Sequence, residues 1–368
     1  MRVGFDVASL ESEQLTGIGV ATKSLYMAMG PIENTSLKPM LKISRFRKAD
    51  RIAAHIGARP QFFWPWKNSS TPEIDVFHGP DFRLPRWSNV AKVVTVHDLV
   101  EFQTDFNTPE FVEHAVQNMK RMIENCRPDV VIVVSEFTKN EFLRHFPTCP
   151  AAVTVVPHGA DHLFPSSRQL GGPTFDRREK VVLSVGTLER RKNVGRLIEA
   201  FIDSGLPQRG YRLKLVGKKG FGAEAELAKA QHPSIDVLGF VSNETLRELY
   251  RTSAIFALPS LYEGFGLPLL EAMAWRLPVL TSESSACAEV ARDAALLVNP
   301  LSIQEIAAAL NALAAQPDLS LDLRYRGSLR SKEFTWANCA QKSTAAYEEA
   351  LLRFQFRIFK PKTSLSWT

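Results

Sequence analysis

The segment 253–275 (SAIFALPSLYEGFGLPLLEAMAW) concentrates residue types that could do chemistry. An apolar run ends at Pro259, the loop Glu263-Gly264-Phe265-Gly266 follows, and Leu267-Pro268 opens a helical pattern. Glycines before a helix let backbone N–H groups approach an anion at the positive end of the helix dipole, which predicts a phosphate site. Glu271, in the same helix, is placed to accept hydrogen bonds from a ribose diol. The alternative is an ordinary strand–turn–helix with two solvated glutamates.

A second segment, 182–198 (VLSVGTLERRKNVGRLI), places cations at a similar junction. A predicted strand ends at Val185, Gly186 begins the turn, and Arg191 and Lys192 stand at the start of a helix. Arginine binds phosphate through its planar fork and lysine binds it as a point charge, so the pair suits a diphosphate. A basic, solvated helix start is the alternative.

The N-terminal half offers glycines and a histidine. Gly17 and Gly19 open the first predicted helix, but Thr22 stands where a dinucleotide fingerprint would need its third glycine. His97 follows the apolar run 92–96. A side chain at the carboxyl end of a parallel strand faces the crevice in which such folds bind ligands, although a buried structural histidine is the alternative.

Short apolar runs alternate with helical patterns along the chain, which predicts parallel sheets in βαβ units. The clearest strands are 2–7, 74–78, 92–96, 129–134, 153–156, 180–185, 211–216, 235–238, 254–258 and 278–281. Helical patterns cover 17–29, 109–125, 136–145, 192–203, 242–251, 267–275, 303–315 and 336–354.

The stretch 160–179 is rich in Pro, Gly, Ser and charge, and it reads as an interdomain linker. The expected domains are 1–165 and 166–335. A C-terminal part, 336–368, is expected to be a helix that packs back towards the first domain, followed by a basic, aromatic tail.

Composition describes a globular protein: 368 residues, 45% hydrophobic and 23% charged. Lys and Arg exceed Asp and Glu by 45 to 39, an excess too mild to imply nucleic acid. The four scattered cysteines show neither zinc-ligand nor disulfide spacing. Neither a signal peptide nor an apolar run long enough to span a membrane is visible, so we expect a cytoplasmic protein.

The run EGFGLPLLEAMAWRLPVLTS resembles the Glu-x7-Glu signature of retaining glycosyltransferases of family four. That resemblance implies the GT-B fold, in which two Rossmann-like, doubly wound domains face each other across a cleft. It also implies that the domain 1–165 binds the acceptor and that the domain 166–335 binds the nucleotide sugar. Arg191-Lys192-Asn193 is similar to the family's Arg-Lys-Asn motif and fits its spacing better than a motif beginning at Arg190. The resemblance covers about residues 1–350 and is strongest over 180–300.

The resemblance assigns roles residue by residue. Arg191 and Lys192 hold the nucleotide diphosphate, Glu263 positions the sugar, and His97 lies near the transferred sugar. These four are the expected catalytic residues. The donor site is expected to comprise Gly17, Gly19, Gly186, Arg191, Lys192, Phe240, Val241, Glu263, Gly264, Phe265, Gly266, Leu267 and Glu271, with Phe240 and Val241 against the nucleobase.

Several weaker candidates accompany them. Glu289 follows Ala288 where the family usually has Pro-Glu, and it is equally well explained as a surface residue of a helix. His78 and Ser135 also lie in segments that look like the family's, and Ser135 has a simpler explanation as a helix N-cap. The role of His158 stays open.

The reaction implied by the resemblance moves a hexose from a nucleotide diphosphate sugar to an acceptor hydroxyl with retention. No DxD cluster or metal-ligand spacing occurs, so we expect no metal and no cofactor beyond the donor. The segments VFHGPDFRLP, TVHDLV and VSEFTKNEF most resemble bacterial mannosyl- and rhamnosyltransferases of polysaccharide or lipid-linked glycan assembly, which favours GDP-mannose. The alternatives are a UDP-sugar or GDP-rhamnose donor, a non-catalytic nucleotide-sugar-binding protein, and a GT-B-fold sugar-nucleotide epimerase.

The segment 38–67 is both basic and aromatic. Its cations are Lys38, Lys42, Arg45, Arg47, Lys48, Arg51, Arg59 and Lys67, its acid is Asp50, and its aromatic residues are Phe46, Phe62, Phe63, Trp64 and Trp66. The tail 353–367 has the same character. Such segments suit an anionic membrane surface, which predicts a peripheral protein on the inner face of the cytoplasmic membrane. A solvated helix face with ordinary aromatic packing is the alternative.

Overall fold

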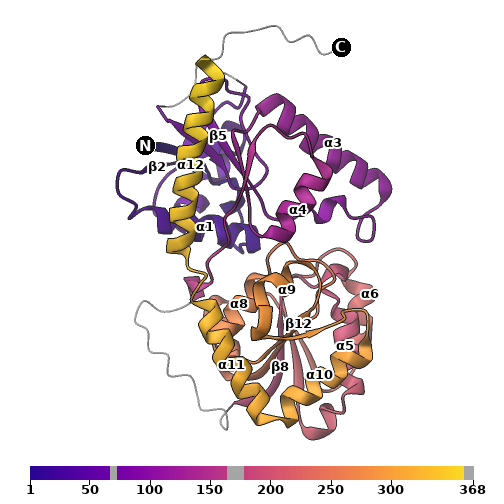
Figure 1. Ribbon diagram of the computed structural model, residues 1–368. Helices are drawn as coiled ribbons and strands as arrows, with labels where there is room; N and C mark the ends of the chain where they lie inside the picture. The colour runs from indigo at the N-terminus through magenta and orange to yellow at the C-terminus, as the bar shows by residue number, and fades with distance from the viewer. Residues whose placement is uncertain (67–72, 164–177, 360–368) are drawn as a thin grey trace. The chain divides into compact units, whose positions relative to one another are not determined.

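The chain is described by a computed structural model covering residues 1–66, 73–163 and 178–359 (Figure 1). By its contacts the chain divides into two compact units. Unit 1 combines Met1–Gly159 with the segment that begins at Trp336, and unit 2 is Ala160–Thr335. The boundary expected at 165/166 lies in 164–177, outside the described residues.

The described residues of unit 1 form a seven-stranded parallel sheet in the order β3-β2-β1-β4-β5-β6-β7. The strands are β1 (Arg2–Asp6), β2 (Ser36–Lys42), β3 (Gln61–Phe63), β4 (Val76–Gly79), β5 (Ala91–Val96), β6 (Val130–Val133) and β7 (Ala152–Val155). The α-helices are α1 (Gly17–Met29), α2 (Ala49–Ile56), α3 (Pro109–Cys126), α4 (Glu136–His145) and α12 (Trp336–Phe359).

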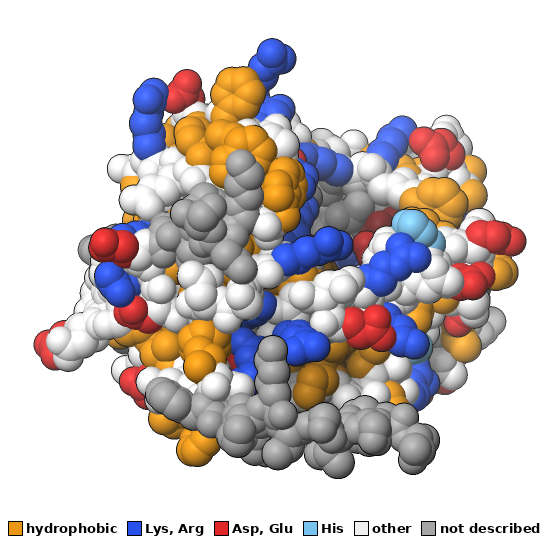
Figure 2. Space-filling model, turned by 90° about the horizontal axis from the view of Figure 1, so that it is seen from above, with side chains coloured by type: hydrophobic (Ala, Val, Ile, Leu, Met, Phe, Trp, Pro, Cys, Tyr) orange, Lys and Arg blue, Asp and Glu red, His pale blue; other side chains and the backbone are white. Residues whose placement is uncertain are grey.

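The last helix, α12, lies along unit 1 and packs against α1 and strands β4, β5 and β6 (Figure 1). The buried Tyr347 hydroxyl lies 2.7 Å from His78 Nδ1, which ties the middle of α12 to β4. Trp336 stacks on His158, beyond the carboxyl end of β7, whereas Arg357 reaches Asp129, just before β6. The helix therefore runs antiparallel to the strands and finishes at the amino edge of the sheet. Figure 2 looks onto this end of the molecule.

The described residues of unit 2 form a six-stranded parallel sheet in the order β10-β9-β8-β11-β12-β13. The strands are β8 (Glu179–Val185), β9 (Arg212–Val216), β10 (Ile235–Gly239), β11 (Ser253–Leu258), β12 (Val279–Ser282) and β13 (Leu296–Val298). The α-helices are α5 (Val194–Asp203), α6 (Ala223–Leu227), α7 (Asn243–Thr252), α8 (Leu267–Ala274), α9 (Ser285–Ala291), α10 (Ile303–Ala315) and α11 (Pro317–Ser331).

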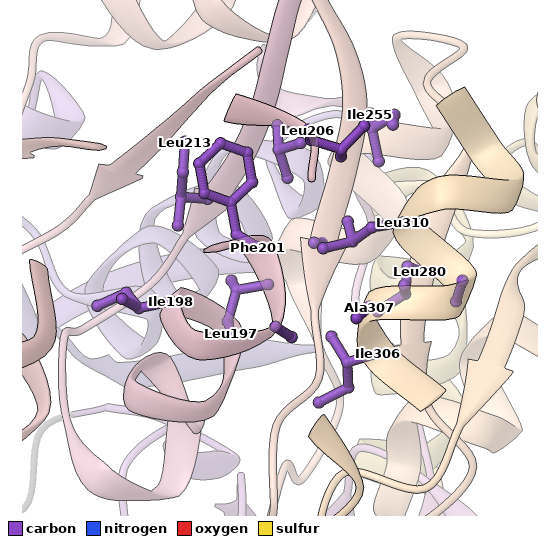
Figure 3. Close-up of a cluster of buried hydrophobic side chains, with 14 of the residues drawn as sticks. Leu197, Ile198, Phe201, Leu206, Leu213, Ile255, Leu280, Ile306, Ala307 and Leu310 are labelled. Carbon is purple, nitrogen blue, oxygen red and sulfur yellow. The ribbon is translucent and has the colours of Figure 1, made fainter. Parts of the chain in front are cut away.

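Helices α5 and α10 supply much of the core of unit 2. On α5, Leu197, Ile198 and Phe201 recur at helical spacing and are fully buried. They pack with Leu310 of α10 and Ile255 of β11 in the cluster of Figure 3. Burying each such side chain contributes roughly 1.5–3 kcal/mol, so this face fixes α5 and the loop that precedes it.

The predicted fold class, two parallel-sheet Rossmann-like domains with a helical C-terminal region, is confirmed. The ten predicted strands all occur, within about two residues of their expected ends. Strands β2, β3 and β13 and helices α2, α6, α9 and α11 were not predicted. Two of the missed strands, β2 and β3, lie in or next to the basic segment 38–67, where Pro39 and the lysines obscure the apolar pattern.

The predicted linker 160–179 is wrong at both ends. Asp161–Leu163 form a short 3-10 helix of unit 2, in which Leu163 is buried and its carbonyl accepts a hydrogen bond from Arg247 Nε at 2.9 Å. At the other end, Arg178 donates to three backbone carbonyls of unit 2 and β8 begins at Glu179. The rest of the segment lies outside the described residues.

Candidate active site

The loop between β11 and α8 brings Glu263 to the carboxyl edge of the unit 2 sheet. Gly266 stands directly before α8 with a φ of 95°, in the left-handed region that favours glycine. A Cβ at this position would lie 2.9 Å from the Leu269 side chain. Leu267 and Pro268 form the first turn of the helix, where the missing N–H of proline loses no bond.

Glu263 is the centre of a buried ion cluster. One carboxylate oxygen, Oε1, pairs with Lys192 Nζ and accepts a hydrogen bond from Ser260 Oγ at 2.8 Å. The other, Oε2, lies 3.3 Å from Arg191 Nη1. Burial by itself raises the pKa of Glu263, but the charges of Lys192 and Arg191 outweigh it and hold that pKa below its usual value. Glu263 is therefore ionised at neutral pH.

The end of β8 positions the two cations. Gly186 has a φ of 152°, a backbone conformation that other residues rarely adopt, and the position of its Cα is in contact range of Lys192, since a Cβ there would lie 3.4 Å from Lys192 Cε. Asn193 ends the 3-10 turn that carries the cations, and its side-chain amide donates to the carbonyls of Pro259 (2.9 Å) and Pro300 (2.6 Å). This amide ties the cationic turn to the end of β11, just before the loop that carries Glu263.

Of the two neighbouring arginines, Arg191 is the one that reaches Glu263. Its Nη1 also donates to the Tyr262 carbonyl at 3.3 Å, and its Nε lies 2.6 Å from Glu189 Oε1. Arg190 is exposed. Each cation of the cluster thus has a carboxylate partner in unit 2.

Glu271, predicted to bind a ribose, is buried and already engaged by two side chains of unit 2. Its Oε2 accepts a hydrogen bond from the Tyr250 hydroxyl at 2.6 Å, and its Oε1 lies 3.1 Å from His162 Nε2. Burial, followed by the Glu271 charge, raises the pKa of Tyr250 well above its usual value, so the hydroxyl stays a donor. A carboxylate has about four lone-pair positions, so further donors can still be accepted.

Sequence reasoning missed Tyr250 and His162. Tyr250 lies in α7, where the pattern predicted only a helix, and His162 lies in the segment taken for a linker. No local signal pairs either residue with Glu271, because the contacts arise from the packing of α7 and of the 161–163 turn near α8.

The last predicted donor residues of unit 2 follow β10. Phe240 is 44% exposed, and Lys218 Nζ lies 5.3 Å from its ring centroid. Val241 comes next and is partly exposed. An exposed ring beside a cation is a flat surface on which a base can stack.

In unit 1, His97 follows β5 and is almost fully buried. Its Nε2 lies 2.6 Å from the Pro80 carbonyl and its Nδ1 lies 3.1 Å from His158 Nε2. Because a carbonyl only accepts, Nε2 carries the proton in the neutral ring and Nδ1 accepts from His158. Burial lowers the pKa of His97, which favours this neutral form.

Gly17 and Gly19 form the first turn of α1 in unit 1. The Thr16 hydroxyl caps the helix by accepting from Gly19 N at 3.4 Å. A Cβ on Gly19 would lie 3.0 Å from the Ser9 carbonyl, whereas one on Gly17 would meet nothing within 4 Å. Gly19 is therefore required by packing, and the space beside Gly17 is open.

The weaker candidates have structural partners. His78 is fully buried between Tyr347 and Thr95 (2.7 and 2.8 Å), and burial lowers its pKa to about 3. Ser135 caps α4 by accepting from Thr138 N at 3.0 Å, which confirms the simpler explanation. Glu289 is half-buried in α9, and its backbone carbonyl accepts from Arg330.

One further acidic residue at a strand end was not predicted. Asp6 ends β1, is buried, and accepts a hydrogen bond from Ala8 N at 2.8 Å. Burial raises its pKa to about 6. Within the ranges that the structure describes, no group of three or more His, Cys, Asp or Glu residues could hold a metal ion.

Comparison with known proteins assigns the chain to a class. The family model for glycosyl transferases group 1 matches residues 169–330, and that for glycosyltransferase family 4 matches residues 41–162. Sucrose-phosphate synthase from Thermosynechococcus elongatus has a similar structure, with a TM-score of 0.72 at 19% identity over 96% of this chain and 99% of that one. Anabaena HepE in complex with UDP-glucose gives a TM-score of 0.69 at 16% identity over 95% and 99%.

Two relatives are mannosyltransferases. The O-antigen chain mannosyltransferase B of Escherichia coli is 28% identical over 285 residues, which cover 74% of each chain. The MMP alpha-(1->4)-mannosyltransferase of Mycolicibacterium hassiacum is 29% identical over 243 residues, 64% of this chain and 57% of the relative. Fold and family matches together define a glycosyltransferase of the GT-B fold. The chain belongs to the family 4 glycosyltransferases.

Proposed function

We propose that this chain transfers mannose from GDP-mannose to a hydroxyl group of a glycan or lipid-linked saccharide in bacterial polysaccharide assembly. Transfer proceeds with retention and without a metal ion. The observation that carries the proposal is the pairing of Arg191 and Lys192 with Glu263 at the carboxyl edge of the unit 2 sheet. Mannose is supported by relatives named an O-antigen chain mannosyltransferase and a serotype-specific mannosyltransferase.

The cationic pair suits the leaving diphosphate. A glycosyl donor breaks its bond to the sugar with growing negative charge on the diphosphate, and fixed cations stabilise that charge without reorganising. Arg191 and Lys192 are held by Glu263 before any ligand arrives. An entering diphosphate is proposed to accept hydrogen bonds from the remaining N–H groups of these cations, while Glu263 and Glu189 keep them in place.

The two glutamates of the Glu-x7-Glu signature take positioning roles in this proposal. Glu263 holds the cations and orients the sugar, and Glu271 receives the ribose beside Tyr250. Retention by two displacements would need a carboxylate to attack from the far face of the sugar. Both oxygens of Glu263 are already bonded to cations, which makes it a poor nucleophile. The departing phosphate is therefore proposed to accept the acceptor's proton on the same face.

One assay tests the sugar donor, the stereochemical outcome of the transfer and its independence of metal ions. Purified protein with GDP-mannose and a mannose-terminated oligosaccharide should release GDP in proportion to product, with an α linkage by NMR and no loss of rate in EDTA. Activity with UDP-sugars or GDP-rhamnose but not GDP-mannose would overturn the donor assignment. A change of the sugar nucleotide without acceptor would indicate an epimerase, and donor binding without turnover would indicate a binding protein.

The proposed location is the inner face of the cytoplasmic membrane, with the protein attached peripherally. No helix within the described ranges is long and apolar enough to cross a membrane. The segment 38–67 exposes Phe46, Phe62, Trp64 and Trp66, which suits an interface. Three of its four arginines, however, pair with acids: Arg45 with Glu11, Arg51 with Glu13 and Arg59 with Asp50. Lys67 and the tail residues 360–367 lie outside the described residues.

A further inference from the structure

A large cavity opens on unit 1, and none of its lining residues is among those assigned to the donor. Its volume is about 860 Å³, and it lies between α3, the loop that follows α4, and the last turns of α12. Residues 127–129 of its lining precede β6 and residues 148–150 precede β7, so it lies at the amino edge of the sheet. His97 follows β5 at the opposite edge.

The cavity is lined by more cations than anions. The cations are Lys120, Arg127, Arg353 and Arg357, and the acids are Glu124 and Asp129. The Asp129 charge is already satisfied, because its Oδ1 lies 3.0 Å from Arg357 Nη1. Lys120 and Arg127 form no ion pair with any residue that the structure describes. The lining therefore carries a positive excess that an anion can neutralise.

Apolar side chains flank these cations. Leu352 and Phe356, one turn apart at the end of α12, are 58% and 73% exposed. Arg353 and Arg357 occupy the adjacent stripe of the same helix. The cavity itself includes Val116 and Phe146. Figure 2 shows this end of the molecule, where Lys and Arg side chains gather around a hollow and hydrophobic side chains lie beside them.

We propose that this cavity binds the phosphate headgroup of an anionic phospholipid, while Leu352 and Phe356 enter the boundary between headgroups and acyl chains. Cations beside exposed apolar side chains match an anionic bilayer surface, where each cation contributes about 1 kcal/mol. Arg353 and Arg357 pair with Glu349 and Asp129, so among the described residues Lys120 and Arg127 supply the cavity's unpaired positive charge. The amino edge of unit 1, rather than the segment 38–67, is then the surface that holds the protein at the membrane.

This docking fixes which edge of unit 1 faces away from the lipid. Strand β5 has six residues, so its carboxyl end, where His97 follows, lies roughly 20 Å beyond the amino edge. If the proposed mannosyl transfer is correct, an acceptor bound near His97 has to extend at least that far from the bilayer. The site therefore selects a growing glycan chain over a single sugar on a lipid.

Flotation with vesicles tests the docking. Full-length protein should bind vesicles of phosphatidylcholine with phosphatidylglycerol and not vesicles of phosphatidylcholine alone. Removing three cations (Lys120→Gln, Arg127→Gln and Arg353→Gln together) should lower the partition coefficient roughly a hundredfold at low salt, since each contributes about fivefold. The double change Leu352→Ser and Phe356→Ser should abolish the salt-resistant part of binding.

A matched variant, Arg47→Gln with Lys48→Gln, removes charge from the segment 38–67 and should leave binding nearly unchanged. All variants should keep the wild-type melting temperature and the turnover of a soluble acceptor, which separates docking from catalysis. Wild-type-like binding by the triple variant, or loss of binding in the matched variant, would overturn the assignment. Binding of inorganic phosphate that the triple variant loses, without any partition of the wild type onto vesicles that contain phosphatidylglycerol, would indicate a free phosphate ligand and would also overturn it.

Acceptor length gives an independent readout. With vesicle-bound acceptors, a lipid-linked polymannose chain should be elongated faster than a lipid-linked monosaccharide, and the triple variant should lose this preference. If neither acceptor is used but docking persists, the proposed reaction fails and the docking site stands.

Discussion

Substituting Glu263 by Gln tests whether the ion cluster is preassembled. The carboxylate is about 5% exposed and neutralises Lys192, which is itself about 8% exposed. Glutamine is nearly isosteric and keeps the Ser260 hydrogen bond, so the change removes charge and little else. Breaking a buried ion pair by removing one partner costs about 3–5 kcal/mol, because the other charge stays buried. Arg191 suffers less, since it retains Glu189.

The expected result is a fall of roughly 6–20 °C in the unfolding transition of unit 2, at about 2–4 °C per kcal/mol for a unit of this size. Differential scanning calorimetry measures it. A second change, Lys192→Met, removes the stranded charge, so the double variant should recover most of the lost stability while staying inactive. The two substitutions must therefore be strongly non-additive.

The pH dependence of the stability supplies a further check of the ion cluster around Glu263. The pKa of Glu263 is lower in the folded chain than in the unfolded one, so its contribution to stability is complete above the ordinary glutamate pKa, about 4.5, and disappears as pH falls through the lower folded value. Wild type and Glu263→Gln should therefore converge at low pH. A single variant as stable as wild type at pH 7, or a double variant no more stable than the single, would refute the cluster.

Four other substitutions have distinct expected outcomes. Glu271→Ala should raise the KM for GDP-mannose about tenfold and leave kcat nearly unchanged, whereas Arg191→Ala should lower kcat by roughly 10²–10³ in initial-rate assays. If both variants kept the wild-type KM and kcat, the assignment of Glu271 and Arg191 to the donor site would be refuted. His158→Phe keeps a ring against His97 but loses the donor to Nδ1, so kcat should fall severalfold and recover in His158→Gln; a fall that Gln does not reverse argues against this hydrogen bond. The pKa of Asp6 is raised from 3.8 to about 6, so the free energy of unfolding falls as pH rises between these two values, and Asp6 no longer changes it above them. Asp6→Asn should therefore stabilise unit 1 by about 3 kcal/mol at pH 7 and by much less at pH 4 in thermal unfolding. Equal stabilisation at both pH values would contradict this.

Sequence patterns located the elements that carry the site because their signals are local. Apolar runs such as 180–185 end at glycines, and the cations or glutamates follow within a few residues. Parallel strands bring such ends to one edge, so Arg191 and Glu263 were expected at one site although 72 positions separate them in the chain. Patterns of this kind require no knowledge of side-chain packing.

Partners of the site residues were not predictable in the same way. Whether the Glu263 carboxylate points to solvent or to Arg191 and Lys192 depends on the side-chain rotamers that pack together in the buried ion cluster. Likewise, His162 was hidden in a segment whose composition suggested a linker, and only its turn against α8 brings it to Glu271. Composition also could not show that Arg45 and Arg51 of 38–67 pair with acids, because Glu11 and Glu13 come from outside the segment.

The partners of the two glutamates bear on how retention is achieved. A nucleophilic carboxylate needs an oxygen lone pair directed at the anomeric carbon and a charge that is not already neutralised. The charge of Glu263 is neutralised by Lys192 and Arg191, and the carboxylate oxygens of Glu271 contact Tyr250 and His162. Freeing Glu263 for attack would break its pairs with Lys192 and Arg191 and would release both cations from the positions in which they stabilise the diphosphate. The same cluster serves better if Glu263 stays with the cations while the departing phosphate, stabilised by them, takes the proton from the acceptor. On this reasoning the pair of glutamates preserves the geometry of the leaving group, and the leaving group performs the base chemistry.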